Sequence, residues 1–215
     1  MKLQSKSTLD ATVYNKIKEM IIENKLKPGE LIVQSQLSLT LGVSRTPLRK
    51  ALGELEKEGL LEGSTVGWCV KEFTKKDMVS VFEIRSVLEG LACRLAAGKL
   101  GAPDLIYWRT LFEHAYEAYQ QGDTEAYYNA DVRFHKAIID ITGDALLART
   151  IGGTRIIETS QVQGLYRDPH ETFGEHLDII EALGANDGER AETLMRNHIR
   201  KAIPYLQSDS YQVYK

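Results

Sequence analysis

Four residues in the second half of the chain have side chains that can bind a metal ion: Asp131, His135, His176 and His198. Asp131 and His135 lie four residues apart in a stretch with helical periodicity, so they share one helix face. That face is otherwise apolar, and an isolated ionised carboxylate there would be costly unless a partner pairs with it. A hydrogen bond to the histidine, a salt bridge from an arginine and a metal ion are the three candidate partners.

His176 and His198 are placed on either side of a predicted turn, GANDG. His176 lies eight residues before Gly184, and His198 lies ten residues after Gly188. At about 1.5 Å per residue these positions are roughly 12 Å and 15 Å from the turn, so an antiparallel hairpin would bring both rings to nearly the same level. Three imidazoles and one carboxylate suit zinc, nickel, iron or manganese. Core histidines satisfied by neighbouring polar groups are the alternative.

The residues after position 72 contain six stretches with helical periodicity. Short separators rich in glycine, proline and aspartate lie between them, as is typical of turns between helices. We therefore predict that residues 73–215 form an antiparallel all-α bundle. The six stretches are residues 75–97, 104–120, 123–141, 145–165, 170–183 and 187–206.

The composition is that of a globular protein. The chain has 215 residues, of which 43% are hydrophobic and 27% charged, enough for one large or two small domains. The sequence contains no run of about 18 apolar residues and no apolar core of a signal peptide near the N-terminus, so we expect a cytoplasmic protein without a membrane partner. Cys69 and Cys93 lie 24 residues apart, a spacing that suggests neither a disulfide framework nor a thiolate zinc site.

The first 72 residues have shorter elements with more turns. Residues 36–41 predict a short helix that ends near Gly42, and a second helix starts at Ser44, whose hydroxyl we expect to cap the first turn. This pattern is typical of a helix-turn-helix. Residues 59–73 then predict a strand, a turn and a strand, with Gly63 and Gly67 permitting the reversal, which would form a wing beside the second helix. The predicted fold is therefore mainly α, with an N-terminal winged helix-turn-helix domain (residues 1–72) and a C-terminal helical domain (residues 73–215).

The second helix of this pattern has a cationic end. Its leucines form an inward stripe, which leaves Arg45, Thr46, Arg49 and Lys50 on the other side near the N-terminus. Such a helix end suits entry into the major groove, where guanidinium groups bind phosphate or a guanine edge. Residues 1–72 carry 11 Lys+Arg against 9 Asp+Glu, and the remainder carries 16 against 21. We predict binding to double-stranded DNA as a homodimer, because one short recognition helix reads few bases.

The same residues resemble a known family. The runs LKPGE, LGVSRTPLRKALGELEKEGLLE and VGWCV, within about residues 10–72, resemble the winged-helix domain of GntR-type bacterial transcriptional regulators. The resemblance implies that Arg45 and Arg49 contact operator DNA and that Gly67 lies at the wing. Ser35 stands where many relatives have a DNA-contacting arginine, so the operator sequence cannot be transferred from them.

The resemblance extends to the second half of the chain. The D-x-x-x-H motif at residues 131–135, followed by His176 and by His198 22 residues later, resembles the metal-binding set of the helical FCD effector domain in FadR-type members of the family. VFEIRSVLEGLACRLAA is similar to the first helix of that domain. The resemblance implies that all four residues bind one divalent transition metal, zinc in the first instance, with nickel, iron or manganese as alternatives. It also implies that a small carboxylate metabolite binds this metal and changes the DNA affinity of the dimer.

Arginines are the candidates for holding the other end of such a metabolite. Arg85 falls on the same helical stripe as Val81 and Leu88, which favours an inward guanidinium; an ion pair with Glu89, four residues on, is the alternative. Arg133 and Arg155 are further candidates.

A metal-dependent hydrolase is the alternative function, since three histidines and a carboxylate with open coordination positions could also activate water. A purely structural metal site is a third reading of the same residues. The sequence offers no evident further general base and no GxSxG or GxxxxGK[ST] motif. Together with the DNA-reading module, this favours a regulator over an enzyme.

Overall fold

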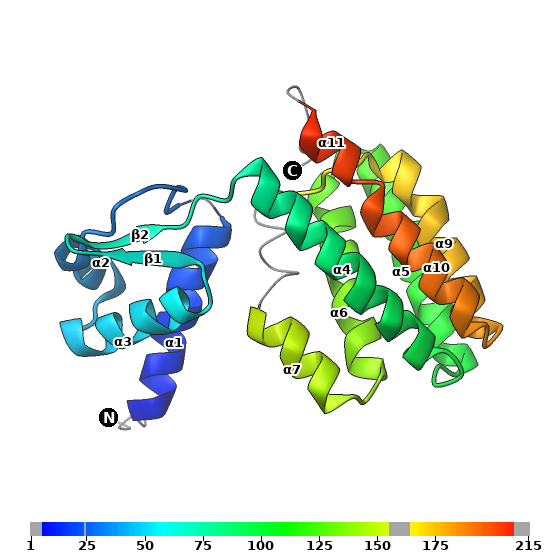
Figure 1. Cartoon of the computed structure of the whole chain (residues 1–215), viewed down its shortest axis with the longest axis horizontal. Coiled ribbons are helices and arrows are strands. Elements are labelled where there is room, and N and C mark those ends of the chain that lie inside the picture. Colours follow the sequence, from blue (N-terminus) through cyan, green and yellow to red (C-terminus); the bar gives the residue numbers. More distant parts are fainter. Residues whose placement is uncertain (1–5, 24, 155–163, 209–215) are drawn as a thin grey trace. The chain divides into compact units, whose positions relative to one another are not determined.

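The computed structural model describes residues 6–23, 25–154 and 164–208, and in it the chain divides into two compact units (Figure 1). The first unit comprises Met1–Phe73 and the second Thr74–Lys215. Helices predominate, and a two-stranded sheet lies in the first unit, so the predicted mainly α fold class is confirmed. Within the described ranges, no helix has the length and apolar character needed to cross a membrane.

Three helices build the first unit: α1 (Lys6–Ile22), α2 (Gln34–Leu41) and α3 (Arg45–Lys57). Val13, Ile17 and Ile21 recur every four residues along α1, and they are buried in one apolar core with the inward leucines of α3. This packing against α1 fixes which side of α3 is left to solvent.

The turn between α2 and α3 depends on two residues with special backbone conformations. Gly42 ends α2 with φ 64°, a left-handed conformation that glycine adopts without strain. Ser44 precedes α3 in an extended conformation, as an N-cap residue should, but its side chain makes no capping hydrogen bond. The prediction that the Ser44 hydroxyl caps α3 is therefore wrong.

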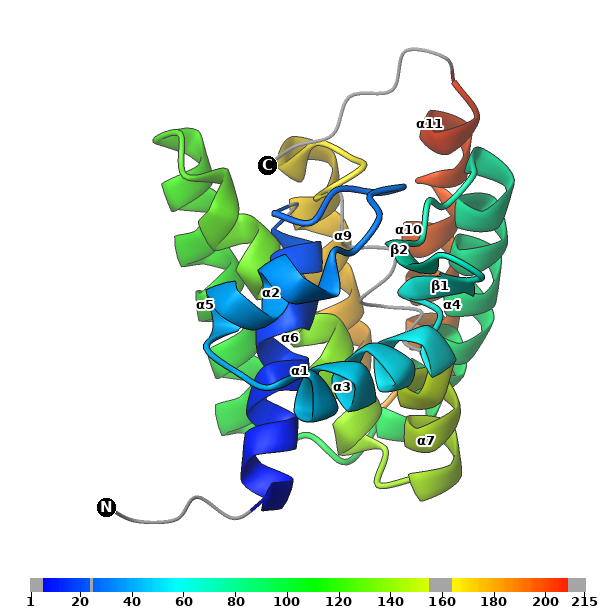
Figure 2. The same cartoon turned by 90° about the vertical axis from the view of Figure 1, so that its left-hand side faces the viewer.

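The predicted wing is present as an antiparallel hairpin of β1 (Leu61–Ser64) and β2 (Gly67–Val70), which Figure 2 shows next to α3. Ser64 pairs with Gly67, so only Thr65 and Val66 make the turn. Gly67 has φ 136°, a conformation that favours glycine. Leu31, just after the LKPGE run, adds one isolated antiparallel bridge to Cys69 of β2.

Each regular element in the described part of the second unit is a helix. The helices are α4 (Lys75–Ala96), α5 (Ala102–Gln120), α6 (Thr124–Ile141), α7 (Ala145–Thr154), α9 (Pro169–Gly184), α10 (Gly188–Arg200) and α11 (Ile203–Gln207). Side chains of Thr74, Asp123, Asp168 and Asp187 accept hydrogen bonds at the first turns of α4, α6, α9 and α10, which explains why these helices begin there.

Two helix predictions in this unit need correction. The stretch 187–206 is interrupted after Arg200, because Pro204 lacks the amide hydrogen that would bond to the Arg200 carbonyl. The stretch 145–165 is helical to Thr154 and not helical at Gly164 and Leu165; residues 155–163 lie outside the described ranges.

The inward face of α4 also differs from the prediction. The buried positions include Phe82, Ser86 and Cys93, whereas Val81 and Leu88, assigned to the inward stripe, are only half-buried.

The core of the second unit holds the site residues in place. Helix α10 packs along α4, and α5 packs against both α6 and α9. Phe112 of α5 and Phe134 of α6 are fully buried, and the ring of Phe112 stacks on the ring of His176 with centroids 4.1 Å apart. The aromatic core therefore forms one wall of the histidine cluster.

Candidate functional site

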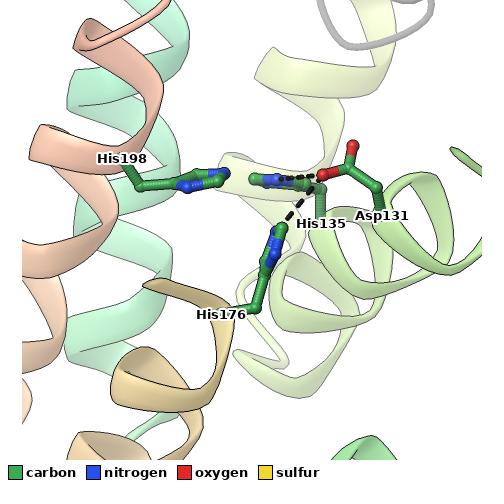
Figure 3. A group of neighbouring side chains, drawn as sticks. All are labelled: Asp131, His135, His176 and His198. Atoms are coloured by element: carbon green, nitrogen blue, oxygen red, sulfur yellow. Dashed lines mark ion pairs between the residues drawn. The ribbon is translucent and has the colours of Figure 1, made fainter. Parts of the chain in front are cut away.

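Asp131, His135, His176 and His198 meet inside the helical unit. One potential ligand atom of each lies within 4.8 Å of those of the others, and Figure 3 shows the side chains converging from α6, α9 and α10. Asp131 Oδ1 is 3.6 Å from His135 Nε2 and 3.2 Å from His176 Nε2. His135 and His176 are 1% and 0% exposed, and Asp131 and His198 are 9% and 8% exposed. Four side chains from three helices thus face one small volume.

The sequence produces this convergence in two ways. Asp131 and His135 are one helical turn apart on α6, beside the buried Phe134. The turn between α9 and α10 brings His176 and His198 to the same level, with ring centroids 4.5 Å apart. The hairpin argument from residue counting therefore gave the correct height for both rings.

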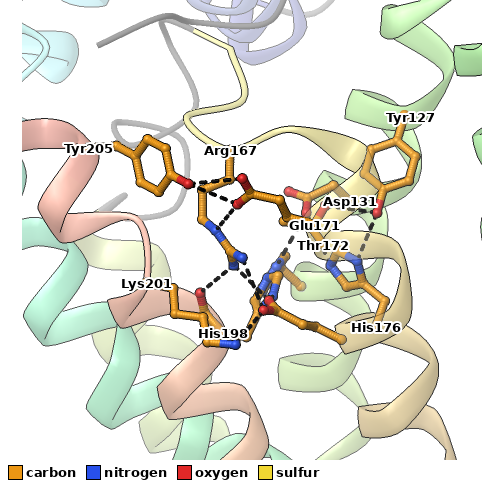
Figure 4. Close-up of polar contacts among 11 residues, drawn as sticks. Tyr127, Asp131, Arg167, Glu171, Thr172, His176, His198, Lys201 and Tyr205 are labelled. Carbon is orange, nitrogen blue, oxygen red and sulfur yellow. Dashed lines mark hydrogen bonds and ion pairs between the residues drawn. The ribbon is translucent and has the colours of Figure 1, made fainter. Parts of the chain in front are cut away.

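Each histidine ring is held through its other nitrogen. His135 Nδ1 lies 2.5 Å from Glu89 Oε2, and His198 Nδ1 lies 2.8 Å from Glu175 Oε2. His176 Nδ1 is 3.2 Å from the hydroxyl of Tyr127 (Figure 4). Such partners at Nδ1 fix the tautomer and direct the Nε2 lone pair to the centre, which is how metal-binding histidines are commonly oriented.

One buried nitrogen at the centre of the cluster lacks a hydrogen-bond partner in the described part of the chain. His176 Nε2 is buried and has no hydrogen-bond partner among the described residues, although Asp131 Oδ1 lies 3.2 Å away. A buried nitrogen left without a partner is unfavourable, and a divalent cation at the centre would bind both it and the carboxylate. The residues present therefore fit a metal ion of borderline softness.

The pKa values of the cluster reflect burial and close charges. Burial alone would raise the pKa of Asp131, but the rings of His135 and His176 hold this pKa well below its usual range. Burial alone would lower the pKa of His135, yet the carboxylates of Glu89 and Asp131 raise it to about 9. Burial and the neighbouring His176 ring lower the pKa of His198 to about 3, and burial lowers that of His176. Two of the three rings are thus neutral near pH 7, as metal ligands must be.

A cavity of about 60 Å³ opens beside the cluster. Its polar lining includes two arginines from different segments, together with three of the four cluster residues. The lining consists of Phe82, Arg85, Asp131, His135, Gly164, Leu165, Tyr166, Arg167, Thr172, His198, Ile199 and Ala202.

The three arginines proposed for a metabolite are placed differently. Arg85 lines the cavity and is 5% exposed, and its Nε lies 2.6 Å from Glu89 Oε1, so the inward orientation and the intrahelical pair occur together. Arg133 is exposed, lies over the ring of Tyr107 at 5.2 Å, and does not line this cavity. Arg155 lies outside the described residues.

Sequence reasoning missed Arg167 and Glu175, and it named Glu89 only as a partner of Arg85 and not of His135. Arg167 lines the cavity and contacts Glu175 through two nitrogens, at 2.6 Å and 3.0 Å. Glu175 precedes His176 in the sequence, but its partner is His198 on the next helix. Glu175 lies in a helix with exposed acidic neighbours, so nothing in the sequence indicates that it is the one that contacts a histidine.

The proposed DNA-contacting residues lie on the surface of the first unit. Arg45, Thr46, Arg49 and Lys50 are all exposed on α3. Lys50 Nζ lies 2.6 Å from Asp10 Oδ2 of α1, so this cation is already paired with a carboxylate. Arg49 lines a groove together with wing residues 63–68, Gly67 among them, so the recognition helix and the wing border one surface.

A winged helix-turn-helix unit, joined in one chain to a helical unit with a buried cluster of three histidines and an aspartate, is the arrangement of a DNA-binding regulator with a second domain. Residues 9–65 match the gntR family of bacterial regulatory proteins, and residues 80–201 match the FCD domain. The chain belongs to the GntR family and carries an FCD domain. It is a transcriptional regulator and not an enzyme, so the alternative of a metal-dependent hydrolase is not supported.

Individual relatives agree with this assignment. The probable D-xylose utilization operon transcriptional repressor of Paenarthrobacter nicotinovorans is 31% identical over 213 residues, which cover 95% of this chain and 93% of the relative. Among solved structures, McbR/YncC of E. coli is 27% identical with a TM-score of 0.76, over 92% of this chain and 96% of that chain. A GntR regulator from Rhodococcus sp. RHA1, 20% identical with a TM-score of 0.74 over 94% of this chain and 98% of that chain, shares the fold.

Proposed function

We propose that this regulator senses a small carboxylate metabolite beside a divalent transition metal held by Asp131, His135, His176 and His198. The observation that carries the proposal is the orientation of the three rings, each fixed at Nδ1 and each turned toward one centre next to a buried carboxylate. When bound, the metal supplies Lewis-acidic coordination positions for carboxylate or hydroxyl oxygens. Zinc is the first candidate, and nickel, iron and manganese suit the same donors.

Charge and size support a small anion in the adjoining cavity. Arg85 and Arg167 both line it and are buried, so a ligand there meets two guanidinium groups away from bulk water. Guanidinium groups bind carboxylates in a fixed, two-pronged geometry. The cavity is small, at about 60 Å³, which favours a small ligand. We therefore keep Arg85 as a proposed effector-binding residue and add Arg167. Arg133 does not line the cavity, so its proposed role has no support from the structure.

The DNA-binding part of the proposal concerns the first unit. A homodimer in the cytoplasm would place Arg45, Thr46, Arg49, Lys50 and Gly67 of each copy at one half-site of double-stranded operator DNA. Exposure of the α3 cations supports this assignment. The metabolite would act by binding one dimer arrangement more tightly than another and so changing their relative populations.

Metal analysis tests the site directly. Untagged protein purified without chelators is expected to contain close to one transition-metal ion per chain, and His198→Ala is expected to contain almost none. His114→Ala is the matched control, because His114 is exposed on α5. Full metal content in His198→Ala, or none in the wild-type chain, would contradict the proposal.

A thermal-shift panel of small carboxylates tests the effector class. Each compound is added to metal-loaded and to metal-stripped protein. A true effector is expected to raise the melting temperature of the loaded protein only, because the metal provides part of its site. Equal shifts in both forms would place the compound away from the metal.

A further inference from the structure

The same three-residue arrangement occurs twice around the cluster, built from different parts of the chain. In each case an arginine that lines the cavity contacts a glutamate, and that glutamate also contacts Nδ1 of a cluster histidine. The first arrangement is Arg85–Glu89–His135 and the second is Arg167–Glu175–His198. Neither glutamate lines the cavity.

The first arrangement spans α4 and α6 and is almost completely buried. Glu89 is 1% exposed; its Oε1 accepts from Arg85 Nε at 2.6 Å, and its Oε2 lies 2.5 Å from His135 Nδ1. Oε2 also accepts a longer bond from Arg85 Nη2 at 3.4 Å, so the short bonds to the two partners use different oxygens. An ionised glutamate at such a depth is stable only with charged or hydrogen-bonding neighbours, and these two residues provide them.

The second arrangement joins the segment before α9 to α9 and α10. Glu175 Oε2 lies 2.6 Å from Arg167 and 2.8 Å from His198 Nδ1, so both partners share one oxygen. Oε1 accepts from Arg167 at 3.0 Å and from Lys201 at 2.7 Å. Sharing of one oxygen means that a stronger bond to the arginine leaves less electron density for the histidine.

We propose that Glu89 and Glu175 are positioning residues of the metal site, and that Glu175 couples metal binding to the state of Arg167 in the cavity. This inference rests on the proposed metal site. A carboxylate at Nδ1 orients the ring and strengthens Nε2 as a ligand, and loss of such a partner commonly lowers metal affinity about 10- to 100-fold. An anion that binds Arg167 would release Glu175 to His198, so the anion and the metal would each strengthen the binding of the other.

Glu171 is a matched control on the same helix. Glu171 also contacts Arg167, at 3.2 Å, and it accepts a hydrogen bond from Tyr205 at 2.9 Å. Among the described residues it makes no hydrogen bond to a cluster histidine. Glu171→Gln therefore removes one carboxylate charge near Arg167 and leaves the ring positions unchanged. Glu89→Gln and Glu175→Gln remove a carboxylate charge together with the histidine contact.

The experiment measures zinc affinity of the full-length wild-type chain and the three glutamine variants by competition with a chelator. Zinc dissociation constants are expected to rise about 10- to 100-fold in Glu89→Gln and Glu175→Gln and less than about threefold in Glu171→Gln. Visible absorption of the cobalt(II)-loaded forms is expected to change in the first two variants only. Circular dichroism of the metal-free variants checks folding, and Glu175→Asp, which keeps the charge, is expected to recover part of the affinity.

A double-mutant cycle tests the coupling. Arg167→Met is expected to strengthen zinc binding in the wild-type background, and the gain should be at least about threefold larger there than in Glu175→Gln. Wild-type affinity and cobalt spectra in both glutamine variants would overturn the positioning role, and equal gains in the two backgrounds would overturn the coupling. A wild-type chain that binds no zinc would instead overturn the proposed metal site, and this inference with it.

Discussion

The two units of the chain place their polar residues in opposite ways. In the first unit the core is apolar, and the residues proposed to contact DNA are exposed. In the second unit the proposed ligands are buried, and of the described residues every buried polar or charged side chain lies there. DNA is a large polyanion that is met at the surface, whereas a metal and a small anion must be enclosed to be bound selectively.

This difference has an energetic consequence. An exposed arginine on α3 is not part of the apolar core that the buried leucines of this helix form, so its loss should change DNA binding and leave folding intact. A buried member of the cluster belongs to a network of charges, and removing one partner leaves the others desolvated and unpaired. Function and stability should therefore be separable in the first unit and linked in the second.

The largest expected effect is that of Glu89→Ala on the stability of the metal-free protein. This change removes the carboxylate that contacts both Arg85 and His135 in the interior. Breaking a buried ion pair in this way typically destabilises a protein by about 3–5 kcal/mol. Urea unfolding measures the change, with Glu54→Ala on the exposed surface of α3 as the control. A loss below about 1 kcal/mol would show that folding of the second unit does not depend on this buried network.

Metal loading should have the next largest effect. A ligand that binds only the native state at 100 times its dissociation constant stabilises that state by about 2.7 kcal/mol. Zinc is therefore expected to raise the unfolding midpoint of the wild-type chain and to leave that of His198→Ala unchanged. Hydrogen exchange should show added protection in α6, α9 and α10, which hold the four proposed ligands. Protection confined to other helices would place the metal elsewhere.

Arg49→Ala should separate function from folding in the first unit. Loss of one guanidinium contact is expected to weaken binding to DNA from upstream of the chain's own gene by about 1–3 kcal/mol. The melting temperature should not change, because Arg49 is exposed on a helix whose other side is buried. Fluorescence anisotropy measures the affinity, with Lys57→Ala at the far end of α3 as the control. Arg49→Lys tests whether the planar group or only the charge matters.

The two units also differ in how much of each could be predicted from the sequence. The recognition helix and its cationic face could be predicted, because a helix-turn-helix is local and its periodicity lies within a few residues. The heights of His176 and His198 could also be predicted from one turn. The contacts of Glu89 and Glu175 with histidines could not be predicted, since helical periodicity assigns a residue to a face but does not identify a partner 46 or 23 residues away.

Acidification should weaken metal binding by a defined amount. Burial alone would lower the pKa of His135, but Glu89 and Asp131 raise it to about 9, so below that pH the metal-free site holds a proton on this ring. The pKa values of His176 and His198 are lowered, and these rings hold none near pH 7. Each ion should therefore displace about one proton, and affinity should fall about tenfold per unit of pH below 9. Calorimetry in buffers of different ionisation enthalpy counts the protons; a count near zero or three would contradict this.

The smallest expected effect concerns Ser44, at the start of the recognition helix. Replacing a serine N-cap by alanine typically destabilises a helix by about 1 kcal/mol, because an amide loses its acceptor. The Ser44 hydroxyl makes no capping hydrogen bond in this structure, so Ser44→Ala should cost less than about 0.5 kcal/mol. The residue is exposed beside Arg45, where a hydroxyl could instead reach a DNA phosphate. A stability loss near 1 kcal/mol would show that the cap forms in solution, and the start of α3 would then contribute to folding as well as to DNA binding.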